Sequence, residues 1–325
     1  MSIVKVHRKH LDTHKWDQLI QNSYTGTVQA EAWYIDLLTD GNWWACCLVQ
    51  DKTEEWLAAM PLYESKKMGN VFSRQPLLSK YWGVMVRRLP SGSGEYQKAS
   101  HVKKCMQELL KLNLDRSVVL DYFTGISPVY PLEYQWQKVS LGCRFTYVLS
   151  LKHEMSELRS QYSKSVRKRI RKLTDAGYRN RFHTNATHLE QVLMMNVAEG
   201  RDLVPQNAIA PLKKLSEKAL ELERGFFLST FSPSGELAAA GFWVHNQEYT
   251  HFISGYVMPE FRKDNVMSLL VDGALEHSRS LSKSFDFFGS SIESIETFFR
   301  SFGARPLPYY RIIKAKFPFS LIWKM

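Results

Sequence analysis

The stretch of sequence that most constrains the fold runs from Tyr249 to Ser282. It begins with aromatic and β-branched residues in alternation, which is the pattern of a β-strand. Pro259 ends this strand, because proline cannot donate a hydrogen bond to a neighbouring strand. From Val266 onward, apolar residues recur at three- and four-residue steps and predict a helix. The chain therefore places the start of a helix beside the end of a strand.

A short basic loop with Arg262 and Lys263 joins this strand to this helix. The first amide N–H groups of a helix lack partners within the helix, and the helix dipole is positive at that end, so anions bind there readily. The two basic side chains add to this attraction. The loop therefore predicts an anion site, although an ordinary strand-to-helix turn gives the same pattern.

The composition is that of a globular protein with anionic partners. Lys and Arg together number 43 and Asp and Glu 32, which gives a net charge of +11. This charge favours nucleic acid, nucleotide phosphates or an acidic membrane surface as partners. With 325 residues, 44% of them hydrophobic, the chain is long enough for two domains or one large one.

Several features predict a cytoplasmic protein. The sequence has no apolar run long enough for a membrane span, and its first residues lack the apolar segment of a secretory signal. The cysteines show no CxxC spacing, and reduced thiols explain them most simply; they are Cys46, Cys47, Cys105 and Cys143. His7, His10 and His14 lie close together, but a helix is expected to begin between them, so we predict no metal site.

A second constraint is a strongly basic helix predicted over residues 155–176. Its apolar residues fall on one face: Met155, Leu158, Tyr162, Val166, Ile170 and Leu173. Basic residues crowd the other faces: Lys164, Arg167, Lys168, Arg169, Arg171 and Lys172. Those near the end of the helix complement its dipole, but the whole cluster repels itself unless an anion lies opposite. We therefore predict a phosphate-bearing partner here rather than a merely solvated face.

The order of the remaining elements predicts an α+β fold with a boundary near residue 150. In the second half, the predicted elements are strands at 226–231, 237–244 and 249–257, the helix that starts near Val266, a strand at 284–291, a helix at 293–302 and a strand at 309–317. The three consecutive strands form an antiparallel meander. Leu57 and Leu237 each open a Leu-Ala-Ala run on the return strand of a predicted hairpin, which suggests two related halves.

In the first half, residues 72–83 (FSRQPLLSKYWG) are unusual for a structural loop. They combine basic, amide and aromatic side chains with proline and glycine, a composition suited to recognition. The alternative is an edge of a sheet that proline interrupts. We keep both interpretations.

Three parts of the sequence resemble the Fem branch of the GNAT acyltransferases, which comprises the peptidoglycan-bridge aminoacyltransferases and the related BioF2-like acetyltransferase domains. They are SVRKRIRK at 165–172 followed by AGY at 176–178, DFFGS at 286–290 followed by FFRSFGA at 298–304, and FSRQP at 72–76 with YWG at 81–83. The order of elements in the second half is also that of the GNAT fold. The resemblance implies two tandem GNAT-like domains, residues 1–150 and 151–325, each a mixed, mostly antiparallel sheet flanked by helices. The second domain would carry the donor site.

The resemblance implies an acyl- or aminoacyl-transferase that moves an acyl group to an amine. The co-substrate would be acyl-CoA or aminoacyl-tRNA, with no tightly bound cofactor, and the acceptor a small molecule or a cell-wall precursor. The basic helix favours tRNA, whereas no helical arm for tRNA is visible in the sequence. Both glycines of a GNAT acyl-CoA loop are missing from residues 262–267. A non-catalytic GNAT-fold protein that binds a phosphate-bearing ligand is therefore the alternative.

The candidate site residues come from the late strands, the basic loop and helix, and segment 72–83. The catalytic candidates are Asp286, Tyr256 and Tyr309; the donor-binding candidates are Ser254, Val257, Arg262, Lys263, Gly289 and Ser290; and the acceptor- or phosphate-binding candidates are Arg74, Gln75, Lys80, Trp82, Arg167 and Arg171. We expect a notch, with bare backbone N–H groups as its floor, where 254–257 part from 286–290. Alternatively, Asp286 only caps the turn at Gly289, and the tyrosines only pack.

Overall fold

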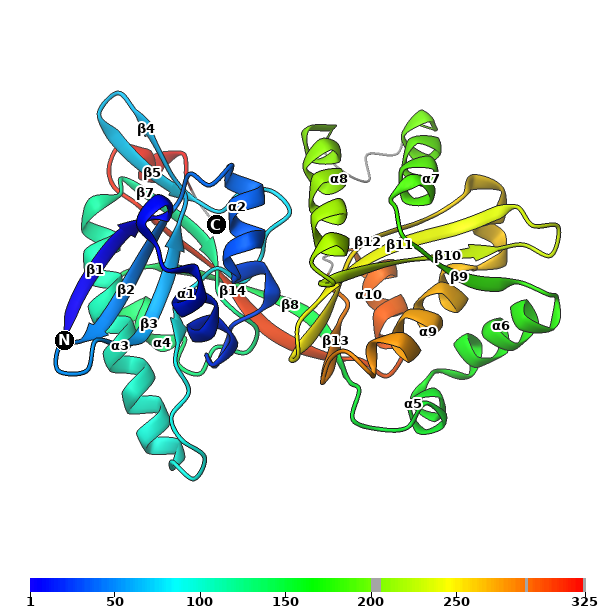
Figure 1. Cartoon of the computed structure of the whole chain (residues 1–325), viewed down its shortest axis with the longest axis horizontal. Helices are drawn as coiled ribbons and strands as arrows, with labels where there is room; N and C mark the ends of the chain where they lie inside the picture. Colours follow the sequence, from blue (N-terminus) through cyan, green and yellow to red (C-terminus); the bar gives the residue numbers. More distant parts are fainter. Residues whose placement is uncertain (200–205, 290–291, 324–325) are drawn as a thin grey trace. The chain divides into compact units, whose positions relative to one another are not determined.

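The computed structural model describes residues 1–199, 206–289 and 292–323. The chain folds into two compact units (Figure 1). Unit 1 comprises residues 1–144 and 308–325, and unit 2 comprises residues 145–307. The chain leaves unit 1 within strand β8 (Ser140–Ser150) and re-enters it within strand β14 (Arg305–Ala315). The last residues thus cluster with the first unit, whereas the sequence led us to place them in the second domain.

Unit 1 contains two groups of strands. In the first, β1 (Ser2–His7), β2 (Trp44–Gln50), β3 (Glu55–Leu62) and β6 (Met85–Val86) pair antiparallel in that order. In the second, the order is β4 (Glu64–Lys67), β5 (Asn70–Arg74), β7 (Val119–Phe123) and β14. Here β5 runs parallel to β7, and the other pairs are antiparallel. Parallel neighbours need a long crossover, which contains helix α3 (Glu95–Arg116).

The other helices of unit 1 are α1 (Thr13–Gln21), α2 (Ala32–Thr39) and α4 (Leu132–Trp136). Asp12 caps α1 as expected from its residue type, since its carboxylate accepts a hydrogen bond of 3.0 Å from the backbone N–H of Lys15. The core of the unit contains large aromatic side chains with no exposed surface, including Trp16, Trp43 and Trp82. A core of this size makes unit 1 a full structural unit rather than an appendage.

Unit 2 is a mixed sheet in the order β8, β13 (Ser284–Asp286), β12 (Tyr249–Val257), β11 (Leu237–His245), β10 (Gly225–Phe231) and β9 (Arg179–His183). Strands β10, β11 and β12 form the predicted antiparallel meander. Strand β13 runs parallel to β12, and helix α9 (Met267–Ser278) lies between them in the chain. The α+β class and the mostly antiparallel sheets predicted from the sequence are confirmed.

Helices cover both faces of the unit 2 sheet (Figure 1). On one face lie α7 (Thr187–Ala198) and α8 (Gln206–Glu221), and on the other lies α9, against which α6 (Lys164–Asp175) packs. Both faces of β10 are in contact with a helix: Phe226 contacts His277 of α9, and Ser229 on the opposite face contacts His188 of α7. Two covered faces explain why β10 and β11 are almost continuously buried.

The single helix predicted over 155–176 is in fact two helices, α5 (Met155–Gln161) and α6. The hydroxyl of Ser163 accepts a hydrogen bond of 3.3 Å from the N–H of Val166 and so starts α6 afresh. Tyr162 and Val166 are both buried on either side of the break. The apolar spacing therefore continues across a change in backbone direction, and periodicity alone gives no sign of it.

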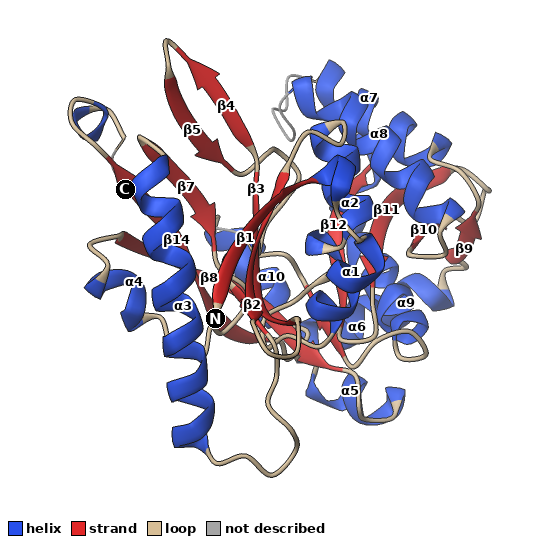
Figure 2. Ribbon diagram, turned by 60° about the vertical axis from the view of Figure 1, so that its left-hand side comes forward, coloured by secondary structure: helices blue, strands red, loops and turns tan. Residues whose placement is uncertain are grey.

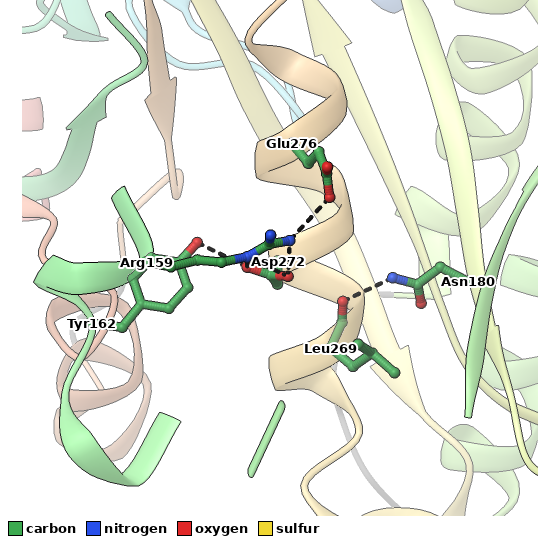
Figure 3. Close-up of polar contacts among 6 residues, drawn as sticks. All are labelled: Arg159, Tyr162, Asn180, Leu269, Asp272 and Glu276. Atoms are coloured by element: carbon green, nitrogen blue, oxygen red, sulfur yellow. Dashed lines mark hydrogen bonds and ion pairs between the residues drawn. The ribbon is translucent and has the colours of Figure 1, made fainter. Parts of the chain in front are cut away.

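An ion-pair network fixes α9 to α5 (Figure 3). The guanidinium of Arg159 donates to both carboxylate oxygens of Asp272, at 3.0 and 2.7 Å, and to Glu276 at 3.0 Å. The hydroxyl of Tyr162 donates to Asp272 at 3.1 Å. Asp272 is only 3% exposed, so its charge depends on these partners. The network holds the helix whose first turn borders the candidate site.

Strand β9 holds α9 from the side opposite to Arg159 (Figure 3). The side-chain amide of Asn180 donates to the backbone oxygen of Leu269 at 2.9 Å and accepts from the Thr230 hydroxyl at 2.6 Å. A Cβ atom at Gly273 would lie 2.3 Å from this amide nitrogen, so only glycine allows the contact. Helix α9 is thus fixed on two sides.

Candidate functional site

The candidate site begins where two parallel strands of unit 2 part. Strands β12 and β13 pair over only three positions, the last of which joins His251 to Asp286. Strand β12 then continues to Val257, whereas the chain after β13 turns towards β8, where the N–H of Phe287 donates to the oxygen of Tyr147 at 2.9 Å. In the part of the chain that the structure describes, one edge of β12 is therefore left without a strand partner from residue 252 onward.

The open edge presents backbone N–H groups. The register of β12 with β11 shifts between Phe242 and Trp243, which leaves Ile253 as the extra residue of a β-bulge. Beyond the bulge, the N–H of Met258 donates to β11. Because successive residues of a strand point their N–H groups to opposite sides, those of Gly255 and Val257 face the open edge. Over the residues that the structure describes, no backbone group of another strand pairs with either amide.

Two adjoining cavities of 430 and 570 Å³ border this edge. They share lining residues from β12, from the first turn of α9 and from α10 (Glu293–Arg300): Gly255, Tyr256, Met267, Ser294, Ile295 and Phe298. We call the two cavities together the β12 cleft. The smaller cavity is lined mainly by apolar side chains, whereas the larger one also has several polar lining residues, among them Asn196, Arg262 and Ser268. Such a mixture suits a small molecule or an extended acyl arm that carries polar groups. The cleft lies where the notch was predicted.

At the point where the strands part lies a buried polar cluster. Asp286 and His251 are fully buried, and the Nδ1 atom of His251 lies 2.7 Å from a carboxylate oxygen of Asp286. The hydroxyl of Thr146 and the N–H of Phe288 donate to the other oxygen. Burial alone would raise the pKa of Asp286, but the hydrogen bonds from His251, Thr146 and Phe288 lower it below its ordinary value. The carboxylate is thus held charged and caps the turn.

The turn after Asp286 requires glycine. Phe288 and Gly289 both have positive φ angles, of 64° and 61°, and a Cβ atom at Gly289 would lie 2.6 Å from the backbone oxygen of Phe145. Both Phe288 and Gly289 line the smaller cavity. Ser290, the last donor-binding candidate, lies outside the described residues. Asp286 itself has no exposed surface, so it positions the wall of the cleft rather than lining it.

Two predicted side chains of β12 line the cleft. Ser254 borders the smaller cavity, and Tyr256 borders both. Burial raises the pKa of the Tyr256 hydroxyl above its usual value, and the nearby Ser254 hydroxyl opposes part of this rise. Tyr256 is therefore neutral at pH 7 and able to donate a proton. Val257 borders the larger cavity, and its backbone oxygen accepts a hydrogen bond of 3.0 Å from Asn196.

The basic loop of the sequence forms a short 3₁₀ helix, η3 (Pro259–Asp264), at the mouth of the larger cavity. The guanidinium of Arg262 donates to Glu199 at 2.6 Å and to Asn196 at 2.8 Å, both near the end of α7. Lys263 is exposed. A donor phosphate that binds Arg262 would have to replace Glu199. The sequence gives no sign that Glu199 and Asn196 bind Arg262, because they are more than 60 residues away in the chain.

One further polar group of the cleft was not predicted. Ser268, in the first turn of α9, is fully buried and lines the larger cavity. In the described part of the chain, its hydroxyl has no hydrogen-bond partner. A buried hydroxyl without a partner is costly unless something in the cavity pairs with it. A serine inside an apolar helical repeat gives no such signal in the sequence.

Two of the predicted acceptor-binding residues make contacts within unit 1. The guanidinium of Arg74 lies over the ring of Trp323, at 5.2 Å. Gln75 bridges to β7: its N–H donates to the oxygen of Asp121 at 3.1 Å, and its side-chain oxygen accepts from the N–H of Phe123 at 2.8 Å. Phe72 and Ser73 pair with β4 on one side and with β7 on the other, so the segment begins within a sheet rather than at its edge. The role of segment 72–83 in recognition stays a prediction.

The other predicted residues of unit 1 are largely packed. Trp82 is fully buried and donates its indole N–H to the oxygen of Gln29 at 2.7 Å. Tyr309 is 6% exposed, its ring lies 5.5 Å from that of Tyr81, and the ammonium of Lys80 lies 5.8 Å from its centre. Tyr309 belongs to unit 1, whereas Asp286 and Tyr256 belong to unit 2.

The basic face of α6 is exposed. Lys164, Arg167, Lys168, Arg171 and Lys172 are all exposed, and Val166 and Leu173 are buried on the opposite side. Within the ranges that the structure describes, no salt bridge joins any of these five cations to an acidic side chain. Arg159, one turn before α6, contrasts with them, because it binds two acidic residues. Over the same ranges, the predicted phosphate-binding residues Arg167 and Arg171 are thus free of acidic partners.

Three further features of the described residues concern possible metal sites, membrane-spanning helices and the state of the cysteines. Among them, no group of three or more His, Cys, Asp or Glu side chains is arranged to hold a metal ion. No helix in the same ranges is long and apolar enough to cross a membrane. All four cysteines are free thiols, three of them buried.

Comparison with known proteins defines the class of fold. The family model described as an acetyltransferase (GNAT) domain matches residues 160–293, which include β12 and α9 and end at the start of α10. No curated protein matches the chain by sequence. The resemblance to the GNAT superfamily, drawn from the DFFGS segment and the order of elements, is therefore confirmed for this part of the chain.

Solved structures extend the likeness to the whole chain. The crystal structure of FemX has 10% sequence identity and a TM-score of 0.75, with 99% of this chain and 100% of FemX covered. A tandem GNAT protein from the clavulanic acid biosynthesis pathway has 13% identity and a TM-score of 0.51, covering 96% and 97%. The C-terminal domain of a putative lysylphosphatidylglycerol synthetase from Agrobacterium fabrum has 10% identity and a TM-score of 0.57, covering 96% and 94%. The chain therefore shares its fold over nearly its whole length with FemX and with a tandem GNAT protein.

Proposed function

We propose that unit 2 is an acyltransferase whose donor lies along the open edge of β12. The observation that carries this proposal is the separation of β12 from β13, which leaves the N–H groups of Gly255 and Val257 facing the β12 cleft. An extended acyl-bearing arm can pair with such an edge much as a strand would. The GNAT family match over residues 160–293 supports the same assignment.

In the proposed reaction an amine attacks the carbonyl carbon of a thioester or ester. A C–N bond forms, the C–S or C–O bond breaks, and the amine loses a proton while the leaving sulfur or oxygen gains one. Charge that develops on the carbonyl oxygen would be stabilised by the N–H of Gly255 or Val257. Tyr256, neutral at pH 7, would donate the proton to the leaving group. Asp286 and His251 would act by fixing the turn at Phe288 and Gly289.

The donor in this proposal carries phosphate and is acyl-CoA or aminoacyl-tRNA. Arg262 and Lys263 would bind its phosphates at the mouth of the larger cavity, with Glu199 displaced from Arg262. Arg167 and Arg171 on α6 would hold phosphates of tRNA or of the acceptor. A cell-wall precursor is the proposed acceptor, in keeping with the Fem-like fold.

The second candidate is a non-catalytic protein that binds a phosphate-bearing ligand with the same fold. Two observations favour it. The loop before α9 lacks the glycines that bring backbone close to a pyrophosphate, and Arg262 is already engaged by Glu199. Binding of a donor without transfer to any amine acceptor would support this candidate.

The proposal is tested by donor binding and by acyl transfer. Thermal unfolding is measured with acetyl-CoA, aminoacyl-tRNA and uncharged tRNA, because a ligand that binds the native state raises the apparent stability by about 2.7 kcal/mol at 100 times its Kd. Ile295→Trp should fill the β12 cleft and weaken donor binding at least about tenfold. Leu222→Trp, equally exposed at 37% but outside the cleft, is the matched control.

Transfer itself is measured with a labelled donor and a set of amines. Tyr256→Phe should lower kcat by roughly 100-fold and leave donor binding unchanged, as for the loss of a general acid. Tyr130→Phe in unit 1 is the control. If no donor stabilises the protein, or if Ile295→Trp and Leu222→Trp behave alike, the β12 cleft is not the donor site.

The role of α6 has a separate test. Arg167→Glu together with Arg171→Glu should weaken tRNA binding and flatten its dependence on salt, since each phosphate contact contributes about 0.7 to 0.9 to the slope of log K against log salt. Lys66→Glu with Lys67→Glu, an equal change of charge in unit 1, should leave both unaffected. An unchanged slope in the α6 variant would remove this helix from the site.

A further inference from the structure

An exposed apolar patch lies in unit 1, whereas elements of unit 2 form the β12 cleft. Residues after β14 form a short 3₁₀ helix, η4 (Phe319–Leu321). Around it, Phe317 is 80% exposed, Ile322 is 78% exposed and Leu321 is 64% exposed. Full burial of such a side chain stabilises by about 1.5 to 3 kcal/mol. Three of them exposed together mark an interaction surface rather than scattered surface residues.

The patch is held in place by the β4–β5 hairpin. The ring of Phe319 lies 5.1 Å from that of Phe72 in β5, and Trp323 contacts both Phe72 and Arg74. Figure 2 shows the hairpin and the η4 turn at the same end of unit 1. The tip of the hairpin carries Met68, which is fully exposed. The apolar groups therefore project from a folded platform rather than from a loose tail.

Lysines surround the apolar groups. Lys66 and Lys67 precede Met68 at the hairpin tip, and both are exposed. Lys67 of β4 is paired with Asn70 of β5, so their side chains lie on the same face of the hairpin. Phe72 is two residues after Asn70 on β5 and therefore lies on that face too. Lys316 directly precedes Phe317 and is also exposed. Exposed apolar side chains surrounded by lysines are complementary to a lipid bilayer whose headgroups are negatively charged and whose acyl chains lie beneath them.

A cationic pocket adjoins the patch. It has a volume of 380 Å³ and is lined by Lys138, Ser140, Lys314, Ser320 and Trp323, among others. Ser320 and Trp323 also belong to the stretch from Phe317 to Trp323, which we call the η4 segment, so the pocket and the patch share one wall. Two ammonium groups and two hydroxyls beside an indole can bind a phosphate with an organic substituent. The pocket thus fits a lipid headgroup next to the groups that would enter the acyl region.

We propose that the η4 segment, the tip of the β4–β5 hairpin and the pocket of Lys138 bind the surface of a bilayer that contains anionic phospholipid. Phe317, Leu321 and Ile322 enter the boundary between headgroups and acyl chains, and Lys138 and Lys314 hold a headgroup phosphate. These residues would lie at the membrane surface. This binding is independent of the acyl transfer proposed for unit 2.

The test is co-sedimentation of the full chain with vesicles of phosphatidylcholine alone and of phosphatidylcholine with phosphatidylglycerol. We expect binding to the mixed vesicles only, weakened by salt. Phe317→Ser with Ile322→Ser should weaken binding about tenfold, and so should Lys138→Glu. The side chains at 317 and 322 are largely exposed, so the double variant should unfold at the same temperature as the wild type.

Two control variants separate this site from general effects. Tyr96→Ser removes a side chain that is 84% exposed on α3, and Lys168→Glu makes the same change of charge on α6 as Lys138→Glu makes at the pocket. Neither should alter binding. Equal binding by the wild type and both patch variants would overturn the proposal. So would stabilisation by glycerol 3-phosphate without vesicle binding, or a dimer that the double variant abolishes without any change in vesicle binding.

Discussion

Each unit contains one pair of parallel strands joined through a helix: β5 and β7 in unit 1, and β12 and β13 in unit 2. In both pairs the last paired position carries an aspartate on the second strand. Asp121 lies opposite Arg74, and Asp286 lies opposite His251. The two aspartates differ in environment, since Asp121 forms a two-point ion pair with Arg311, whereas Asp286 is fully buried with His251 and Thr146.

The two pairs differ most at the residues just beyond this last paired position. In unit 1, Gln75 continues the pairing with its own backbone and side chain, both of which bond to β7. In unit 2, the turn at Phe288 and Gly289 carries the chain to β8, and β12 runs on alone. A strand edge closed by an amide side chain has no room for a ligand beside it. In unit 2, the turn after β13 leads the chain away from β12, and the β12 cleft lies along the edge that this turn leaves open.

The largest effect should come from the two aspartates. Asp286→Ala leaves the buried His251, the Thr146 hydroxyl and the N–H of Phe288 without their acceptor, and should lower the free energy of unfolding by about 3 kcal/mol. Asp121→Ala breaks an ion pair whose arginine side chain is 29% exposed and can be hydrated, and should cost about 1 kcal/mol. Denaturant unfolding measures both. Equal losses would contradict the difference in environment.

An intermediate effect concerns acid. Burial, with smaller contributions from Arg224 and His277, lowers the pKa of His245 in unit 2 to about 4. The unfolded chain therefore binds a proton that the folded chain excludes, so stability should fall as the pH drops from about 6.5 to about 4. His245→Gln should remove about 3 kcal/mol of this loss.

The measurement is the free energy of unfolding against pH for the wild type and for His245→Gln. His101→Gln is the control in unit 1, where burial also lowers the pKa of the histidine, but by less than at His245. Parallel curves for the wild type and His245→Gln over this range of pH would show that His245 does not titrate as described.

The smallest effect tests the closed edge of unit 1. Gln75→Ala removes the acceptor of the Phe123 N–H and should cost about 1 kcal/mol. Gln75→Glu retains an acceptor oxygen and should cost less than Gln75→Ala. Thermal unfolding of both variants measures this order. If neither change lowers stability, the side chain does not hold the edge closed, and another feature must account for the difference between the units.

Local patterns predicted the elements well. The alternation of side-chain types predicted the strands of the meander, and Pro259 predicted the end of β12. Apolar residues at three- and four-residue steps predicted α9. The same spacing failed at Ser163, where a capping hydroxyl starts a new helix although the apolar face continues. The bulge at Ile253 was also missed, because it depends on how β12 pairs with β11 and not on the residue itself.

The sequence by itself determined the order of elements, the tandem GNAT resemblance and the place along the chain where the strands part. These features rest on short-range preferences that neighbouring residues already express. Only the tertiary structure decided which side chains meet there. His251 reaches Asp286 across 35 residues, Thr146 reaches it across 140, and Glu199 reaches Arg262 across 63. Such contacts depend on strand register and helix packing, and no local pattern contains them.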